Sequence, residues 1–180
     1  MPTKDGPVGP FPPDVDPDEY DRLRRRVLWT MPSGLSVVGS RAGDRRNAMT
    51  LNWATQVAFD PKVLMISVEQ EALTHQLIHD GGSFALCVID REDRAIVRKF
   101  TKPVDVDQSA MTMNGFAFHD APSGAPVLDQ AVAWLDCRVM NEVTVGDHTA
   151  FFGEVTACGF QRPEDTPVLR MEDTRMNYGG

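Results

Sequence analysis

The residues of this chain best suited to chemistry stand at the start of a short predicted helix. Thr74 and His75 precede the run 76–80, which ends at two glycines. A hydroxyl, a titratable ring and the free amide groups of a helix start could together hold a phosphate. The alternative is an ordinary helix cap, and the nearby acids Glu69 and Glu71 weaken the case for a bound anion.

His75 and His79 are four positions apart on one face of this helix, a spacing that a metal ion could use. The residues between them lack the glutamate of a zinc protease, and no third ligand is apparent. We therefore expect no metal site. The chain also lacks a GxGxxG motif after a strand, a phosphate-loop lysine and a GxSxG turn, so no dinucleotide fold, nucleotide-triphosphate loop or nucleophile elbow is predicted.

The stretch 47–68 contains two β-like runs joined by a turn at Asp60-Pro61. Alternation along the first run predicts one face with Thr50, Asn52, Ala54 and Gln56, and an opposite face with Met49, Leu51, Trp53, Thr55 and Val57. Small and hydrogen-bonding groups on one face of a sheet could hold a polar, planar ligand. The alternative is a strand of mixed polarity that binds nothing.

Composition limits the class of protein. With 180 residues, of which 42% are hydrophobic, the chain fits one globular domain with a sizeable core. A net charge of −8 argues against a nucleic-acid partner and against an anionic membrane. Cys87, Cys137 and Cys158 are far apart in apolar runs, which predicts reduced core thiols and a cytoplasmic protein. No segment is long and apolar enough to suggest a membrane span.

The first 17 residues hold six prolines and predict an irregular arm on the surface or on a partner subunit. A helix is predicted from Pro17 to about Leu28, because Asp16 can cap it and acids fill its first turn. Its arginines, at positions 22, 24, 25 and 26, fall near the end where cations are favoured. We interpret them as a solvated face rather than a phosphate site.

The rest of the chain is predicted to be mostly strands. They are expected at 35–40, in the two runs of 47–68, at 83–89, 133–143 and 148–160, and around 168–171; short helices are expected at 74–80 and 91–100, and an irregular region at 101–124. Six or seven antiparallel strands with two or three short helices predict a mainly β fold, a closed or nearly closed barrel with flanking helices. Closure removes exposed sheet edges.

Six short motifs follow one another in a specific order: residues 47–50 (NAMT), 59–61 (FDP), 74–75 (TH), 82–88 (GSFALCV), 133–139 (AWLDCRV) and 146–155 (GDHTAFFGEV). This series closely resembles the flavin reductase-like family of FMN-binding split barrels. The resemblance covers roughly residues 27 to 170, and the ordered series is much more specific than any one motif. The domain is therefore expected to span residues 18–180, after the arm of residues 1–17.

The resemblance implies a homodimer that binds FMN, or FAD in some members, and passes hydride from NADH or NADPH to the flavin. Thr74 with His75 would hold the phosphate, and His148 would lie near the flavin and the nicotinamide. The residues implied to line the isoalloxazine ring are Thr50, Leu51, Asn52, Trp53, Ala54 and Thr55.

Two of the implied positions depart from the family pattern. Trp53 stands where the family more often has a smaller or less rigid residue, and would either stack on the ring or partly block it. Tyr178 in the C-terminal tail is expected to take the place of a family Gly-Arg-Tyr-like segment near the flavin. From the residues alone, His148 at the mouth of a hairpin is either exposed enough to meet a ligand or a turn-stabilising group.

The leading hypothesis is an NAD(P)H-dependent flavin reductase, with the reductase component of a two-component monooxygenase as its expected setting. Because the flavin carries the redox chemistry, the protein need only bind, orient and exclude solvent. The alternative is a split-barrel protein that binds flavin or the deazaflavin F420 without rapid nicotinamide turnover. A flavin-free interaction module would leave the polar stretch unexplained.

Overall fold

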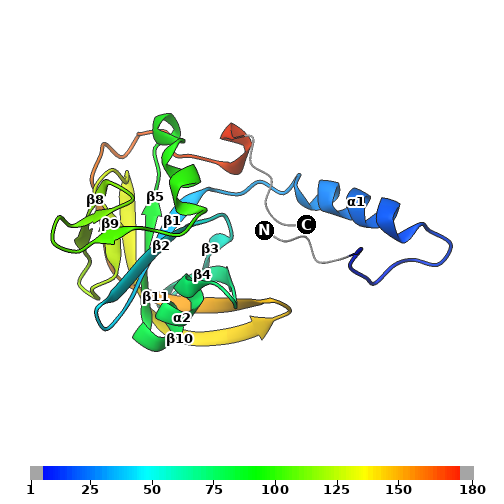
Figure 1. Cartoon of the computed structure of the whole chain (residues 1–180), viewed down its shortest axis with the longest axis horizontal. Helices are drawn as coiled ribbons and strands as arrows, with labels where there is room; N and C mark the ends of the chain where they lie inside the picture. Colours follow the sequence, from blue (N-terminus) through cyan, green and yellow to red (C-terminus); the bar gives the residue numbers. More distant parts are fainter. Residues whose placement is uncertain (1–5, 175–180) are drawn as a thin grey trace. The chain divides into compact units, whose positions relative to one another are not determined.

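The structure is a computed structural model, and it describes residues 6–174. The chain divides into two compact units, one made of residues 1–32 with 175–180 and the other of residues 33–174. The second unit contains every strand of the described chain (Figure 1). No helix among the described residues is long and apolar enough to cross a membrane.

The first unit is built around α1 (Pro17–Leu28), which has the predicted bounds. The side chain of Asp16 accepts a hydrogen bond from the Glu19 amide at 2.9 Å, so the predicted cap is present. Arg24 pairs with Asp21 at 2.6 Å and donates to the backbone carbonyls of Val8 and Pro10. This arginine therefore ties the preceding segment to the helix, rather than standing free in solvent.

The second unit is organised around a fully antiparallel, seven-stranded sheet with the strand order β2-β1-β5-β10-β11-β4-β3. Its strands are β1 (Ser36–Ala42), β2 (Arg45–Leu51), β3 (Ala54–Phe59), β4 (Lys62–Glu69), β5 (Ser83–Val88), β10 (Ala133–Val145) and β11 (His148–Phe160). Six of these strands form hairpins with a strand adjacent in the chain: β1 with β2, β3 with β4, and β10 with β11. The seventh, β5, lies between β1 and β10. The predicted mainly β class is confirmed.

The two edge strands of this sheet, β2 and β3, are consecutive in the chain and are separated only by Asn52 and Trp53. The sheet must therefore curl until its edges meet at this link, which gives a barrel that is split between β2 and β3. This corrects the expected single run of 47–59. Alternation does not continue across the link, so Thr50 and Asn52 do not share one strand face with Ala54 and Gln56.

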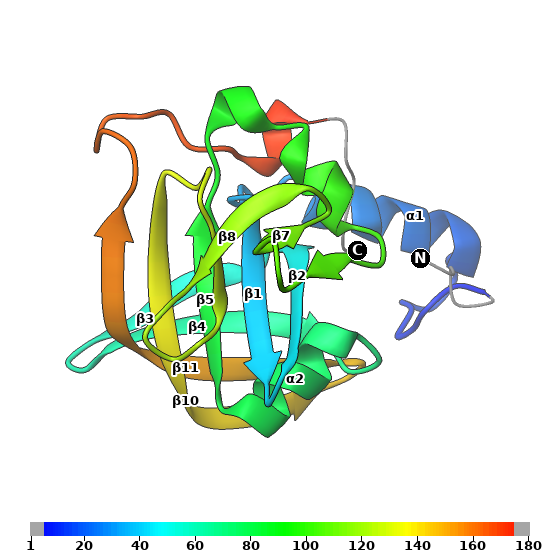
Figure 2. The same cartoon turned by 60° about the vertical axis from the view of Figure 1, so that its left-hand side comes forward.

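The barrel core is formed by side chains from several strands, among them Val38, Ile66, Phe84 and Phe151, all fully buried. Helix α2 (Leu73–Gly81) adds Ile78 to this cluster and lies at one end of the barrel (Figure 2). Burial of these apolar side chains is the main force that holds the barrel together.

The predicted glycine stop of α2 is confirmed. Gly82 ends the helix with a φ of +68°, a left-handed conformation that glycine adopts without steric cost. The preceding Gly81 lies against β1, where a Cβ atom would come within 1.9 Å of the Arg41 carbonyl oxygen. The second glycine of the pair is thus needed for the turn and the first for close packing.

Residues 91–124 differ from the prediction. Instead of one helix over 91–100 there are two 3-10 turns, η1 (Arg91–Asp93) and η2 (Ile96–Phe100). The region 101–124, expected to be irregular, contributes three short strands to a four-stranded sheet: β6 (Val106–Asp107), β7 (Thr112–Met113) and β8 (Phe116–Asp120). The fourth strand is β9 (Pro126–Leu128). Strands of two residues leave too few alternating positions for a sequence pattern to show them.

The prediction of a strand around 168–171 is also wrong. Val168 and Arg170 form only isolated bridges, with Asp90 and Gly34, and a 3-10 turn, η3 (Met171–Asp173), follows. Hydrogen bonds at two single points fix the segment without forming a ladder.

All three cysteines lie in strands, but only two of them are core thiols. Burial raises the pKa of both Cys87 and Cys137 to about 12, so their thiolates do not form near neutral pH. Cys158 is exposed on β11, which corrects the expectation that it belongs to the core.

Candidate functional site

The turn between β10 and β11 places His148 at the first position of β11. Its Nδ1–H donates to a carboxylate oxygen of Asp147 at 2.7 Å. An ionised carboxylate only accepts hydrogen bonds, so Nδ1 carries a proton; in the tautomer protonated only there, Nε2 is an acceptor. Nε2 is buried and has no hydrogen-bond partner within residues 6–174. Leaving a buried polar atom without a hydrogen bond costs about 1–3 kcal/mol of folding free energy, and a ligand bound at this position would remove that cost.

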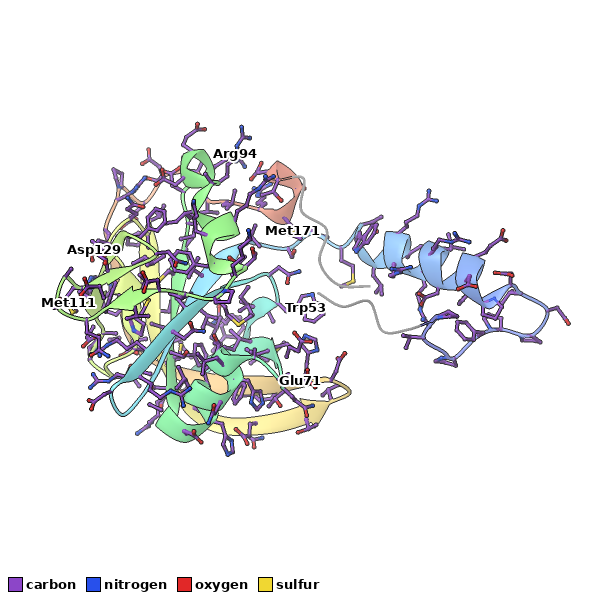
Figure 3. All side chains as sticks on the ribbon, viewed as in Figure 1. Trp53, Glu71, Arg94, Met111, Asp129 and Met171 are labelled. Carbon is purple, nitrogen blue, oxygen red and sulfur yellow. The ribbon has the colours of Figure 1, made fainter. Side chains whose placement is uncertain are left out.

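Trp53 lies beside this histidine. The centroids of the two rings are 5.0 Å apart, and their planes are inclined by 59°. The Trp53 carbonyl accepts a hydrogen bond from the Ser67 amide at 3.0 Å, which fixes the link between β2 and β3 to β4. The residue is 36% exposed, and its indole projects outward from the barrel (Figure 3). It therefore offers a flat apolar surface next to the unpaired nitrogen.

The remaining residues of the predicted ring-binding segment differ in what they can offer. Asn52 is buried, and its side-chain amide makes no hydrogen bond within the described chain. Thr50 donates its hydroxyl to the Val97 carbonyl at 2.5 Å, so that proton is already used. Leu51 and Ala54 pack in or against the core. Only the backbone atoms of Leu51 and Ala54 are left for a ligand.

The sixth of these residues, Thr55, lies on the exposed strand β3, and its hydroxyl is 3.5 Å from the Gln56 carbonyl. At that distance the hydrogen bond is weak. Thr55 is therefore free to reorient toward another partner.

Thr74 does not cap α2, which corrects the alternative considered from the sequence. The cap position is Ala72, and no side chain of the described residues caps the helix. Thr74 is buried and its hydroxyl accepts a hydrogen bond from the Asn47 amide at 2.8 Å, so it ties α2 to β2. The first backbone amides of α2 therefore keep their capacity to bind an anion.

His75 and His79 are stacked with their ring centroids 6.5 Å apart, but they have different partners. His75 Nε2 is 2.8 Å from the Thr149 hydroxyl, and loss of solvation lowers its pKa, against the opposing effect of Glu142. His79 Nδ1 is 2.9 Å from Glu142, and this hydrogen bond raises the pKa of His79. Each ring is thus held by an oxygen-bearing side chain of the β10–β11 hairpin.

The parts of the site are connected through the end of β4. His148 pairs with Glu69 of β4, and the Ala72 amide at the start of α2 donates to the Glu69 carbonyl at 3.1 Å. His148 and Thr149 are neighbours in β11. The barrel therefore brings Trp53, His148 and the start of α2 to one region. Tyr178 lies outside the described residues.

Sequence reasoning missed four residues that support these groups. Asp147 orients His148, Thr149 contacts His75, and Asn47 contacts Thr74. Gln70 contacts the turn that carries His148. Asp147 and Thr149 could have been found from the sequence, because they flank His148 in the GDHT motif. The Asn47 and Gln70 contacts join residues 27 and 76 positions apart, so only the strand register reveals them.

The residues present fit a flavin. The ring of a flavin is flat and carries hydrogen-bonding edges. The site offers an indole surface, together with the Asn52 amide and the His148 Nε2, neither of which has a hydrogen-bond partner among residues 6–174. The uncapped start of α2 is suited to the phosphate.

Comparison with known proteins agrees with this geometry. Residues 28–179 match the model of the flavin reductase like domain. The NADH-dependent FAD reductase of Streptomyces globisporus is 35% identical over 144 residues, covering 78% of this chain and 76% of the relative. The solved structure of the Streptomyces globisporus C-1027 NADH:FAD oxidoreductase SgcE6, in complex with NAD and FAD fragments, superposes with a TM-score of 0.72 at 31% identity, covering 87% of this chain and 90% of that one.

A second similar structure is the styrene monooxygenase flavin reductase of Pseudomonas putida S12. Its TM-score is 0.65 at 28% identity, and the match covers 78% of this chain and 88% of that chain.

The chain belongs to the flavin reductase like domain family. The family, the split-barrel fold and the assignment as a flavin oxidoreductase, all predicted from the sequence, are thereby confirmed.

Proposed function

We propose that the protein transfers hydride from NADH to FMN or FAD at the site formed by Trp53, His148 and the start of α2. The buried Nε2 of His148, which has no hydrogen-bond partner within residues 6–174, is the observation that carries the proposal, because a buried polar atom without a partner favours the binding of a polar ligand group there. The related FAD reductase and the NAD and FAD fragments bound to SgcE6 support the choice of NADH and of a flavin.

The roles follow from what each side chain can still bind. His148 Nε2 accepts a hydrogen bond from the flavin or the nicotinamide and orients it, while Asp147 holds the ring in place. Trp53 covers one side of the bound ring and excludes water. Asn52 binds a polar edge of the ring, and Thr74 with His75 places the α2 amides against the phosphate. A bound flavin supplies the hydride acceptor, its N5 atom.

We further propose that the reduced flavin leaves for an oxygenase partner. The similarity to the styrene monooxygenase flavin reductase supports this setting. A cytoplasmic location is proposed with it, since the buried, unpaired thiols of Cys87 and Cys137 suit a reducing compartment.

A homodimer is proposed on the properties of β3. This strand is an edge of the large sheet, has no charged residue and no proline, and exposes Val57 and Phe59 at 47% and 85%. Soluble proteins rarely leave such an edge uncovered. Because β3 starts next to Trp53, a second copy on this edge would lie beside the site.

The test is anaerobic mixing of the purified protein with FMN or FAD and excess NADH or NADPH, followed by flavin absorbance. Bleaching much faster with the protein than without it, and faster with NADH than with NADPH, is the expected result. Flavin that binds and stays oxidised with both nicotinamides would contradict the proposal. It would support the binding-protein alternative, which a titration with the deazaflavin F420 would then examine.

A further inference from the structure

Gln70 is a polar residue that the proposed reaction does not use, although it makes three hydrogen bonds to the turn carrying His148. It lies in the connection between β4 and α2, and its side chain is exposed. Its backbone amide donates to the Asp147 carbonyl at 3.0 Å. Its side-chain Nε2 donates to the Gly146 carbonyl at 2.9 Å and to the His148 carbonyl at 3.3 Å. One residue thus holds three successive carbonyls.

The turn needs such a support. Residues 140–147, at the tip of the β10–β11 hairpin, are all exposed, so little packing fixes this tip. Gly146 has a φ of +61°, which is a turn conformation suited to glycine and adds no side chain to pack. The hydrogen bonds of Gln70 therefore add to the strand pairs Val145–His148 and Glu69–His148 in fixing the turn.

The position of the turn sets the position of the reactive ring. His148 is bonded to Asp147 within the same turn and is flanked by Trp53. α2 begins three residues after Gln70, with the Ala72 amide bonded to the Glu69 carbonyl. The same short connection thus joins the start of α2 to the turn that carries His148.

We infer that Gln70 is a positioning residue, which fixes the distance between His148 Nε2 and the start of α2 through its three hydrogen bonds to residues 146–148. The inference rests on the proposed function, in which these two points bind one flavin and its hydride donor. A displacement of about 1 Å at a reacting centre can cost roughly a hundredfold in rate. A turn held less firmly therefore slows hydride transfer without abolishing flavin binding.

The decisive substitution is Gln70→Glu, because glutamate has the same size but its carboxylate cannot donate to a carbonyl. Gln70→Ala removes the same donors without adding a charge. Gln130→Glu is the matched control, since Gln130 is an exposed glutamine in another turn and makes no side-chain hydrogen bond among the described residues. The measurements are the flavin reduction rate at saturating NADH, the KM for NADH and the Kd of the flavin.

We expect both Gln70 variants to reduce flavin about tenfold more slowly, with an unchanged flavin Kd and a wild-type rate in Gln130→Glu. A wild-type rate in Gln70→Glu would overturn the inference. Equal losses in flavin affinity and in rate would also overturn it, because they would show general loosening. If Gln70→Ala does not fold, the isosteric Gln70→Glu decides.

A readout that needs no turnover separates this inference from the proposed function. The imidazole NMR signals of His148 should shift in Gln70→Glu and remain in place in Gln130→Glu. If the wild-type protein does not reduce flavin, the proposed function fails, while these signals still report whether Gln70 positions the ring. Unshifted His148 signals in both Gln70 variants would refute the positioning role.

Discussion

His148 combines a satisfied nitrogen with an unsatisfied one. The bond from Nδ1 to Asp147 orients the ring, and the buried Nε2 has no hydrogen-bond partner within residues 6–174. Among the described histidines, His119 provides a useful contrast, because its Nδ1 makes a similar bond to Asp129, also at 2.7 Å, on the exposed surface. The same pair of side chains thus occurs once in the candidate site and once outside it.

This contrast yields the first prediction. His148→Ala should lower kcat/KM for NADH about a hundredfold, because a hydrogen-bonding group that orients the reactants is lost. His119→Ala should leave kcat/KM at the wild-type value. Steady-state oxidation of NADH with added flavin measures both. Equal activities of the two variants would refute the assigned role of His148.

The second prediction concerns pH and His75. Burial lowers its pKa below the ordinary 6.5, so folding disfavours the charged ring and the unfolded chain binds more protons in the acid range. The advantage in unfolding free energy of wild type over His75→Gln should therefore shrink as the pH falls from about 8 to about 5. Urea titrations across this range measure it.

His79 provides a control of opposite sign. Its bond to Glu142 raises its pKa, so its stabilising contribution is fully present below the ordinary value of 6.5 and is lost as the pH rises through the higher folded pKa. His79→Gln should therefore lose most stability at acid pH. The same pH trend in both variants would contradict the two assignments.

At the scale of elements, close contact between β1 and β9 decides how the smaller sheet sits on the barrel. Gly39 of β1 faces the backbone of Pro126, the first residue of β9. A Cβ atom at position 39 would lie 2.0 Å from the Pro126 carbonyl oxygen. No side chain fits between the two strands at this point.

The third prediction follows from that contact. Gly39→Ala should destabilise the protein by about 1–3 kcal/mol, because one of the two strands must move. Gly34→Ala is the matched control, since a Cβ atom there has no neighbour within 4 Å among the described residues, and its effect should stay within about 0.5 kcal/mol. Chemical denaturation followed by circular dichroism gives both values. Similar stabilities of the two variants would contradict this prediction, because they would show that β9 can move away from β1 without loss of folding free energy.

At the scale of the whole molecule, the split of the barrel leaves β3 as an edge with apolar side chains exposed. β3 begins directly after Trp53, so whatever covers this edge also borders the candidate site. The proposed homodimer would bury it. Charged residues on an edge strand are a common means of preventing such pairing.

The fourth prediction uses this property. The double variant Val57→Lys with Phe59→Lys should shift a wild-type dimer to a monomer of 19.9 kDa in sedimentation equilibrium. Phe160→Lys is the control, because Phe160 is also an exposed phenylalanine, 59% accessible, at the end of β11. A monomeric wild-type protein, or a double variant that remains dimeric, would refute the proposed interface.

Much of the fold could be predicted because long segments carry strong local signals. The helix at Pro17–Leu28 has a cap, a proline and acids at its start, and the long strands β10 and β11 flank a clear Gly-Asp turn. The errors fall where such signals are short or depend on distant partners. The 3-10 turns at 91–100 and the two-residue strands β6 and β7 are examples.

For the site, the sequence by itself determined the candidate residues, since the GDHT motif and the Thr-His helix start are local in the chain. It also determined the family, through the order of its motifs. Only the tertiary structure decided which groups remain available. Thr50 and Thr74 have their hydroxyls engaged by Val97 and Asn47, whereas the Nε2 of His148 is left without a partner within residues 6–174. The physical reason is that hydrogen-bond satisfaction depends on strand register and barrel closure, which bring together residues far apart in the chain.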